Sequence, residues 1–481
     1  MEVKLLLSMM QIFNTFTRQL EEFEPLNPPV VKFYACGPTV YDFAHLGHLR
    51  KYCMDDILIR TLLHNNFEVK HVQNVTDVGH LTSDADSGED KIEKGARKYA
   101  LEPLAVAKKF EDYFYYSMDL IGNLRPTIVC RATENIPAML ALVETLEAKG
   151  FTYIIEGDGV YFDTSKLDHY GQLAGLDIEQ LMAGARVAPV AGKKNVTDFA
   201  LWKFERPGEN RAMTWPSKWS KRSYPGWHIE CSAMSMKYLG DQLDIHTGGV
   251  DHIAVHHTNE IAQSESATGK KPFSKYWVHH NFLKIENEKM SKSLNNFFTI
   301  DDVIARGFSP QALRLLFLST HYRSEMNFTW ENLAGAETSW QKLQRLMANW
   351  MASSNGKTTD SVPAQTYHQQ FFTALNKDLD TPTALAILWQ VTKDNALSEA
   401  EKYALLLEFD QVFGLGLDKI KFLQQETAVD ALPSAVQQLL QARQQARESH
   451  NFAQADQLRD ELASLGYQVN DTPTGQKLTQ L

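Results

Sequence analysis

Cysteine is scarce in this chain, with four in 481 residues, and this excludes one large class of proteins. The cysteines are too few and too widely spaced for the disulfide framework of a small secreted domain, which fits a reducing compartment. We therefore expect a cytoplasmic protein. The chain is too long for one core, and the usual domain size predicts about three domains. The cysteines are Cys36, Cys53, Cys130 and Cys231.

Long hydrophobic runs and an excess of positive charge are also missing. A membrane span needs about 20 apolar residues, and the three-leucine run in the N-terminal MEVKLLLSMM is too short even for a signal peptide. We expect no membrane partner and a translation start at Met9 or Met10. The net charge of −11 argues against a generic polyanion binder, although a local basic patch could still bind a nucleic acid.

Two short apolar runs with a helical segment between them form the first structural pattern. Residues 30–35 lie between a Pro-Pro and a Gly-Pro pair and are typical of a buried strand. From His45 onward apolar residues recur at helical spacing, and 69–75 is typical of a second strand. A strand, a helix and a strand in this order predict a βαβ unit, and hence a parallel sheet with a nucleotide-type crevice.

Two short polar motifs carry candidate chemistry. In HLGH, residues 45–48, two histidines at a helix start could bind a metal or donate N–H groups to an anion, and Gly47 would let a phosphate approach closely. On its own, this motif is weak evidence for a binding site, and two half-exposed loop histidines are the better interpretation. In KMSKS, residues 289–293, two lysines and two serines could follow a triphosphate as its charge redistributes. Alone, it is equally well a solvated loop.

Together the two motifs are far more specific. They resemble the HIGH and KMSKS sequences of class I aminoacyl-tRNA synthetases, with Leu46 in place of isoleucine. Five further stretches resemble the cysteinyl-tRNA synthetase family in particular, and the resemblance covers nearly the whole chain. They are FYACGPTVYD (33–42), NVTD (74–77), PGWHIECSAM (225–234), DIHTGGVDH (244–252) and HHTNEIAQSE (256–265).

A candidate metal site lies in these stretches. His256 and Glu260 are four residues apart in a helical pattern, so their side chains share one face. With Cys36 and Cys231 they offer two thiolates, an imidazole and a carboxylate, which suit one Zn²⁺ ion. Composition alone would also allow His257, and no spacing joins Cys36 to the others, so it is the resemblance that selects these four. For a single cysteine, a buried apolar role is the alternative.

The resemblance also implies the residues of the substrate pocket. Thr76, Trp227 and His246 would contact the amino acid, with a core aromatic as the alternative for Trp227. The residues implied for ATP are Thr39, His45, His48, Gly248, Gly249, Asp251 and Lys292. Those implied for catalysis are His45, His48, Lys289 and Lys292, of which Lys292 would neutralise charge on the leaving pyrophosphate.

The implied reaction has two steps. The carboxylate of L-cysteine attacks the α-phosphate of ATP to give cysteinyl-adenylate and pyrophosphate, and the 3′ end of tRNA(Cys) then accepts the acyl group. Positioning and electrostatic stabilisation would carry this chemistry, with Mg²⁺ accompanying ATP. Zinc binds a thiolate at about 2.3 Å and a hydroxyl less well, so it would reject serine without hydrolytic editing.

The C-terminal tail resembles the small anticodon-binding domain of the same family. Residues 434–466 have an amphipathic helical pattern. By position, Phe452 would stack on an anticodon base and Asp471 would contact a base edge. Arg447 is a further candidate for tRNA binding, with a salt bridge on a solvated face as the default alternative.

The expected fold class is α/β. We expect a monomer with a Rossmann-like parallel-sheet catalytic domain that carries an inserted connective module, followed by a helical bundle and a small anticodon-binding domain. The expected boundaries are 11–124 and 226–300 for the catalytic domain, 125–225 for the inserted module, 301–427 for the stem and helical bundle, and 433–481 for the anticodon-binding domain.

Two other functions remain as alternatives. A ligase that joins cysteine to a sugar amine shares the motifs and the zinc site but typically lacks the tail that is present here. A non-catalytic nucleotide- or tRNA-binding paralogue is disfavoured by the complete motifs. The chain departs from the family at Thr247, where glycine is common, at Thr258, where glutamate is common, and at 79–88, where the loop is longer.

Overall fold

The chain forms two compact units. Residues 1–346 and 354–418 make up the first unit, and residues 347–353 and 419–481 make up the second. The computed structural model describes residues 9–79, 90–175, 192–290, 296–351, 359, 361–420, 433–449, 451–465, 467–472 and 475–480.

A five-stranded parallel sheet lies at the centre of the first unit, as predicted. Its strands are ordered β11–β10–β3–β4–β5, so the chain runs outward from β3 to β5 and then returns to the other side of β3. Sheets with such a reversal bind ligands at the carboxyl ends of the two strands that meet there, here β3 and β10. The strands are β3 (Val30–Ala35), β4 (Glu68–Val75), β5 (Ile128–Arg131), β10 (Leu243–Gly249) and β11 (Ser274–His280).

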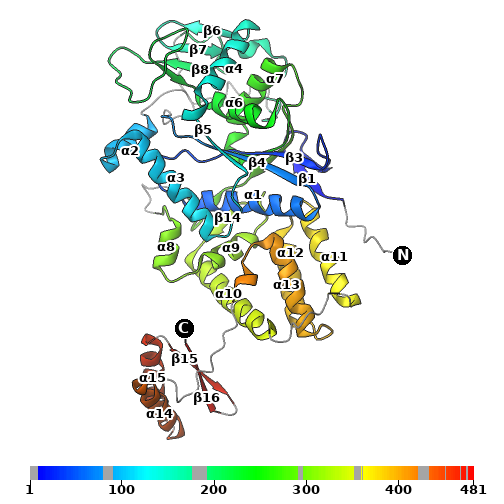
Figure 1. The fold of residues 1–481 in the computed structure, drawn as a ribbon, viewed down its shortest axis with the longest axis vertical. Helices are drawn as coiled ribbons and strands as arrows, with labels where there is room; N and C mark the ends of the chain where they lie inside the picture. Colours follow the sequence, from blue (N-terminus) through cyan, green and yellow to red (C-terminus); the bar gives the residue numbers. More distant parts are fainter. Residues whose placement is uncertain are drawn as a thin grey trace. The chain divides into compact units, whose positions relative to one another are not determined.

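Helices cover both faces of this sheet (Figure 1). The apolar run of β3 is buried from both sides, which explains why it does not alternate between apolar and polar residues. One face is covered by α1 (Leu46–His64) and α3 (Pro103–Leu120), which follows α2 (Lys91–Tyr99). The other is covered by α4 (Ile136–Ala148), α6 (Trp227–Leu239) and α7 (His256–Thr268).

A separate antiparallel sheet is built from residues between α4 and α6. Its strands are ordered β6–β7–β8–β9, and the buried Trp202 of β8 donates its indole N–H to Ser223 Oγ of β9 at 2.7 Å. The range predicted for the inserted module also contains β5, which pairs with β4 in the parallel sheet. The domain boundaries remain predictions. The strands are β6 (Thr152–Ile155), β7 (Gly159–Phe162), β8 (Phe199–Phe204) and β9 (Ser223–Pro225).

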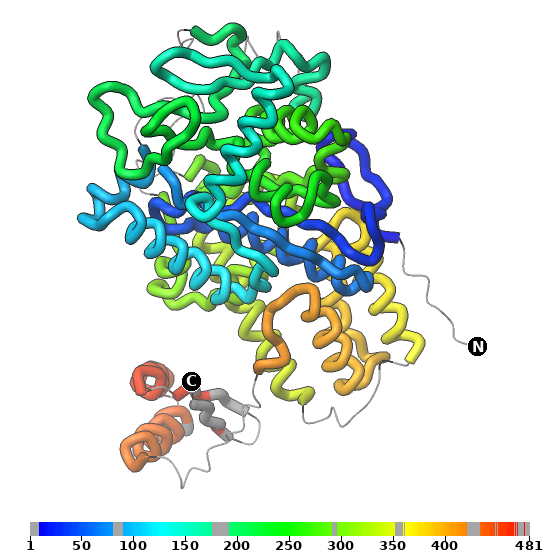
Figure 2. Tube along the Cα trace, turned by 45° about the horizontal axis from the view of Figure 1, so that its top comes forward, coloured from blue at the N-terminus to red at the C-terminus, as the bar shows by residue number. Residues whose placement is uncertain are grey.

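Helices dominate the first unit beyond residue 300, and α11, α12 and α13 pack on one another as a bundle (Figure 2). Helix α13 also packs against α1, so the bundle supports the helix that carries HLGH. The helices are α8 (Ile300–Ala305), α9 (Pro310–Leu318), α11 (Val362–Asn376), α12 (Thr381–Lys393) and α13 (Glu399–Phe413), together with α10 (Trp330–Met351) as far as residue 346. Short strands complete this unit: β1 (Gln11–Asn14), β2 (Gln19–Glu22), β12 (Leu283–Ile285), β13 (Glu288–Lys289) and β14 (Met326–Phe328).

The second unit contains a helical hairpin and a β-hairpin. Helices α14 (Ser434–Glu448) and α15 (Phe452–Ser464) pack on each other, and β15 (Tyr467–Thr472) pairs antiparallel with β16 (Gly475–Gln480). Arg443 of α14 donates to Gln476 Oε1 of β16 at 2.9 Å and so ties the two hairpins together. A small apolar core lies between them, made of Val436, Leu440, Leu462, Tyr467 and Val469.

Arg314 joins the helical region to α1 through a buried ion pair. Its guanidinium is fully buried, pairs with Asp56 of α1, and donates to Phe413 O, Ile121 O and Asn123 Oδ1. We expect Arg314→Met to destabilise the fold by about 3–5 kcal/mol, because it leaves buried carbonyls without their donor and removes one of the two cations that pair with Asp56, the other being Arg60. The midpoint of thermal unfolding measures this loss.

A surface arginine is the matched control for that substitution. Arg125 pairs with Asp119, and both side chains are 51% exposed. Arg125→Met should change stability by less than about 1 kcal/mol. Equal losses in the two variants would contradict the assignment of Arg314 as a buried anchor.

Candidate active site and metal centre

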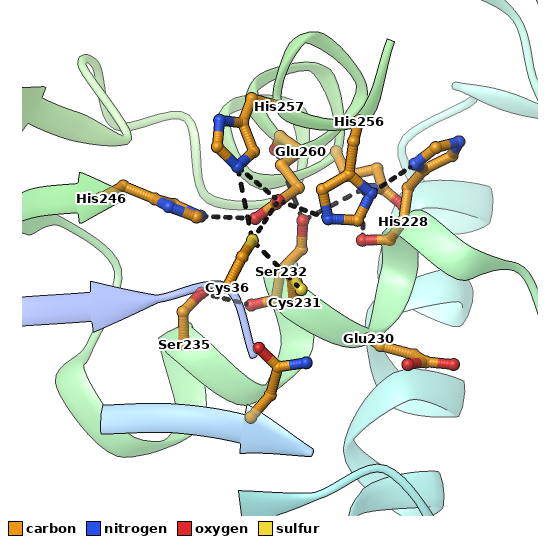
Figure 3. Close-up of polar contacts among 12 residues, drawn as sticks. Cys36, His228, Glu230, Cys231, Ser232, Ser235, His246, His256, His257 and Glu260 are labelled. Atoms are coloured by element: carbon orange, nitrogen blue, oxygen red, sulfur yellow. Dashed lines mark hydrogen bonds and ion pairs between the residues drawn. The ribbon is translucent and has the colours of Figure 1, made fainter. Parts of the chain in front are cut away.

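Cys36 lies immediately after β3, where β3 meets β10. Its backbone N–H donates to Thr247 O at 3.1 Å, and the N–H of Gly37 turns away to Asn74 Oδ1 at 2.7 Å. A Cβ at Gly37 would lie 1.5 Å from Asn74 O, so a side chain at this turn would displace the backbone. The turn presents the Cys36 thiol to helices α6 and α7 (Figure 3).

Four buried side chains form a cluster that could hold a metal ion: Cys36, His256, His257 and Glu260. One ligand atom from each lies within 4.8 Å of all the others. Cys36 Sγ is 3.3 Å from His257 Nε2 and 3.9 Å from Glu260 Oε1, which is 3.0 Å from His256 Nε2. Helix α7 places His256 and Glu260 one turn apart on the same face, so both reach Cys36.

Cys231, on the facing helix α6, brings a second thiol to this cluster. Its Sγ lies 3.9 Å from Cys36 Sγ. Two thiolates bound tetrahedrally to zinc at about 2.3 Å would lie about 3.8 Å apart, so this separation fits a shared ion. The structure therefore brings together Cys36, Cys231, His256 and Glu260, the four ligands predicted from the sequence, and adds His257. The donor set and the burial suit zinc.

The acid–base state of the cluster shows how its charges are balanced. Burial raises the pKa of the Cys36 thiol, but a hydrogen bond with Cys231 and the charge of His257 bring it well below its ordinary value. Burial lowers the pKa of His256, whereas the charge of Glu260 raises it to about 10. A proton on His256 thus supplies positive charge beside a thiolate and a carboxylate. A metal ion would displace that proton and take over this role.

Further histidines contact the cluster residues and hold them in place. Glu260 Oε2 lies 2.9 Å from His246 Nε2, and His228 Nδ1 lies 2.9 Å from His256 Nδ1. His257 Nδ1 lies 2.7 Å from His279 Nε2 of the neighbouring strand β11. Partners of this kind fix the tautomer and the ring orientation of metal ligands.

Sequence reasoning missed His228 and His279, which contact the ligand histidines, and Glu230, which accepts from Thr76. His228 and Glu230 lie inside PGWHIECSAM, and His279 ends the strand next to β10. A His or Glu one to three residues from a proposed ligand, or at the end of an adjacent strand, was the available signal. Of the three departures from the family, Thr247 accepts the Cys36 N–H through its carbonyl, and Thr258 Oγ1 donates to Ile253 O at 2.8 Å. The longer loop lies outside the described residues from position 80 onward.

The residues predicted for the amino acid lie around the cluster. Trp227 is half-buried, and its ring packs on His256 with a centroid separation of 4.9 Å. Thr76 is buried at the end of β4 and donates to Glu230 Oε2 at 3.1 Å. Glu230 directly precedes Cys231 in the sequence. Thr39 bridges to Thr76 through the backbone. His246 contacts the cluster through Glu260, and Trp227 contacts it through His256.

HLGH forms the first turn of α1 and caps it with its own histidines. His45 Nδ1 accepts from the backbone N–H groups of Gly47 and His48, at 3.1 and 3.3 Å, and His48 Nδ1 accepts from His45 N at 3.2 Å. The two rings stack at 3.7 Å. An accepting Nδ1 leaves the ring proton on Nε2. Both histidines therefore have an Nε2–H donor at a helix N-terminus, which favours anions.

His48 stays neutral at physiological pH. Burial lowers its pKa to about 4, although the negative charge of Asp251 acts in the opposite direction. Asp251 follows the Gly248-Gly249 pair at the end of β10. A Cβ at Gly248 would lie 2.5 Å from His257 Cε1, so glycine is needed there for α7 to approach. Of the residues predicted for ATP, Gly248, Gly249 and Asp251 thus lie at the carboxyl end of β10, and His45 and His48 lie at the helix start that follows β3.

The segment around KMSKS reaches the same helix end. Lys289 is exposed in β13, which follows β12 through a two-residue turn at Glu286 and Asn287, both with positive φ. Lys292 lies outside the described residues. Farther along the chain, Phe298 O accepts the backbone N–H of Leu46, which lies inside HLGH, at 3.0 Å. A backbone hydrogen bond therefore joins HLGH to the segment that follows KMSKS, five residues after its last serine.

In the second unit, the residues predicted for tRNA lie on separate elements. Phe452 begins α15 with 58% of its surface exposed, which is unusual for a large apolar side chain. Arg447 is exposed in the last turn of α14. Asp471 lies in β15, and its side chain is outside the described set. The exposed ring of Phe452 suits base stacking.

Two domain families match the sequence. "tRNA synthetases class I (C) catalytic domain" covers residues 22–338, and "Cysteinyl-tRNA ligase anticodon binding domain" covers residues 429–477. The chain is 46% identical to cysteine–tRNA ligase 1 of Burkholderia lata, covering 97% of this chain and 96% of that protein. This chain belongs to the cysteine–tRNA ligase family.

Other members of the family agree in length as well as in sequence. The chain is 40% identical to the cysteine–tRNA ligase of Treponema denticola and 40% identical to that of Thermus thermophilus, with 96% of this chain and 98% of each relative covered. The family membership predicted from the motifs is confirmed.

Solved structures bear out the fold. Methionyl-tRNA synthetase of Mycobacterium tuberculosis in complex with methionyl-adenylate is similar with a TM-score of 0.56 at 14% identity, covering 89% of this chain and 96% of that one. The LeuRS–tRNA–LeuAMS complex of Agrobacterium radiobacter K84 is similar with a TM-score of 0.57 at 13% identity, covering 83% and 85%. In the part of the chain that the structure describes, no helix has the length and hydrophobicity to cross a membrane.

Proposed function

We propose that this chain activates L-cysteine with ATP and transfers it to tRNA(Cys). The observation that carries the proposal is the buried cluster of Cys36, Cys231, His256 and Glu260 beside the HLGH turn. A thiol-rich metal centre is the chemistry expected for an enzyme that must recognise a thiol. The family relationship and the anticodon-binding tail support tRNA as the acceptor.

A zinc ion held by those four residues would supply a Lewis acid that binds the substrate thiolate. The protein's own residues shape the remaining pocket. Trp227 packs on His256 and would close the pocket over the cysteine side chain. Thr76, hydrogen-bonded to Glu230, would face the polar end of the amino acid. Serine would offer a poorly acidic hydroxyl in place of the thiolate, and so bind far less well.

On the nucleotide side, His45 and His48 would donate their Nε2–H groups to the phosphates of ATP. Both rings are held by reciprocal capping bonds, so their donors are positioned before ATP binds. Gly248, Gly249 and Asp251 would contact the adenosine, and Thr39 the phosphates. Lys289 and Lys292 would neutralise charge on the departing pyrophosphate together with Mg²⁺. Transfer to tRNA would follow in the same pocket.

Phe452 tests the proposed role of the second unit. We expect Phe452→Ala to raise the KM for tRNA in the charging reaction about 5- to 100-fold, the range of a lost base stack, without changing adenylate formation. Steady-state charging and pyrophosphate exchange measure the two effects. Leu465→Ala, also an exposed apolar residue of this unit, should change neither. A loss of adenylate formation in Phe452→Ala would contradict the assignment.

The whole proposal is tested by two assays on the wild-type protein. Cysteine-dependent exchange of pyrophosphate into ATP is expected, followed by charging of tRNA(Cys). Exchange without charging, but with transfer to a sugar amine, would identify the other ligase. The absence of both would leave a nucleotide- or tRNA-binding protein.

A further inference from the structure

The carbonyl oxygen of Cys36 has two side-chain donors, both from α1. Lys51 Nζ and Tyr52 Oη each lie 3.0 Å from Cys36 O. Cys36 and Tyr52 are buried, with 4% and 6% of their surfaces exposed. Lys51 and Tyr52 lie three and four residues after His48 on the same helix. One helix thus contacts both the metal-binding residue and the phosphate side of the pocket.

In the part of the chain that the structure describes, no backbone N–H of the sheet donates to this carbonyl. Strand β3 ends at Ala35, and the N–H of Cys36 makes the last bond to β10, at Thr247 O. A buried carbonyl without a donor is costly, so Cys36 can keep this position only while α1 supplies one. The Tyr52 hydroxyl and the Lys51 ammonium therefore help to fix the position of the Cys36 thiol.

The donors are themselves held in place. Lys51 Nζ forms an ion pair with Asp55 Oδ2 at 2.7 Å, and Asp55 Oδ1 lies 2.7 Å from His280 Nε2 at the end of β11. Lys51 Nζ also lies 4.2 Å from the ring centroid of Tyr52. Burial raises the pKa of Asp55, but the charges of Lys51 and His280 hold it below its ordinary value, so the carboxylate stays charged. The chain of contacts ends in the sheet.

We propose that Lys51 and Tyr52 are positioning residues for cysteine recognition, which set the place of the Cys36 thiol by holding its carbonyl on α1. The inference rests on the proposed function, because it takes the Cys36 thiol as a metal ligand. Moving Cys36 by a few tenths of an ångström would leave His45 and His48 at the helix start unchanged. Cysteine binding should therefore weaken while ATP binding does not.

Tyr52→Phe is the mildest test, since it removes one hydroxyl from a buried ring. We expect the KM for cysteine to rise about fivefold, the effect of one lost hydrogen bond, with the KM for ATP unchanged. The double variant Lys51→Met/Asp55→Asn removes the second donor without leaving an unpaired buried carboxylate. It should show a larger loss in the same direction.

A readout independent of activity uses the protein loaded with Co²⁺ in place of zinc. Thiolate-to-cobalt absorption, followed during a titration with L-cysteine, gives the affinity for cysteine directly. We expect weaker cysteine binding in Tyr52→Phe with one metal bound per chain. Tyr115→Phe loses a buried hydroxyl that donates to Gln73 at 3.2 Å, and Lys32→Met loses an ammonium that donates to Gln242 O at 3.3 Å. Both controls should titrate as the wild type does.

The outcomes separate this inference from the function on which it rests. Wild-type affinity for cysteine in both Tyr52→Phe and the double variant would overturn it, as would equal losses for cysteine and ATP. If the double variant does not fold, the titration of Tyr52→Phe decides. A wild-type protein without pyrophosphate exchange would overturn the proposed function, while the cobalt titration would still report whether α1 governs cysteine binding.

Discussion

Replacing Cys231 with alanine is expected to abolish cysteine-dependent pyrophosphate exchange and to empty the metal site. The substitution removes one of two thiols that lie 3.9 Å apart and leaves Cys36 as the remaining thiol beside His256, His257 and Glu260. Loss of residues that only support metal ligands costs about 10- to 100-fold, so loss of a ligand should exceed 100-fold. Exchange assays and zinc per chain, measured by mass spectrometry, follow both effects.

A second buried cysteine serves as the control. Cys130 lies on β5, where its thiol contacts Gln73 O at 3.6 Å, and no contact of it with the metal cluster is among those of the described residues. Cys130→Ala should keep zinc and activity, with a stability cost of about 1 kcal/mol. Full activity and full cysteine-over-serine selectivity in Cys231→Ala would show that the cluster does not recognise the substrate.

Replacing His48 with alanine is expected to slow adenylate formation about 10²- to 10³-fold while zinc is retained. The variant loses the Nε2–H donor at the start of α1 and one half of the capping pair, but leaves Cys36 untouched. Since the pKa of His48 is about 4, the ring is already neutral at pH 7, and lowering the pH from 8 to 6 should not change its contribution. Single-turnover kinetics measure the rate.

Two variants complete this test. Cys36→Ser should show the converse pattern, with zinc and cysteine binding lost first. His64→Ala, at the far end of α1, removes a ring stacked on Phe372 and should leave the rate of adenylate formation unchanged. Loss of zinc in His48→Ala would mean that Cys36, His45 and His48 share one metal site, as their nearness in sequence would allow.

The fold was predictable where local patterns determine it. The strand at 30–35 and the helix from HLGH follow from an apolar run, a Gly-Pro break and helical spacing, and both are present as β3 and α1. The place of β5 was not predictable, because a four-residue strand has little pattern of its own. It belongs to the parallel sheet only through its pairing with β4.

The same distinction holds for the site. His256 and Glu260 could be paired from their spacing, because a helix brings residues four apart together. The convergence of Cys36 with Cys231 depends on β3 and α6, which are far apart in sequence, and only the family resemblance indicated it. The contacts of His279, Lys51 and Tyr52 arise from packing between elements. No short motif encodes them.

The central claim is that the metal cluster binds the substrate thiolate, and zinc X-ray absorption spectroscopy tests it most directly. Without substrate, the account predicts two sulfur ligands, from Cys36 and Cys231, with the remaining ligands nitrogen and oxygen. On addition of L-cysteine the sulfur count should rise by one, and L-serine should leave it unchanged. An unchanged sulfur count with saturating L-cysteine would contradict the account.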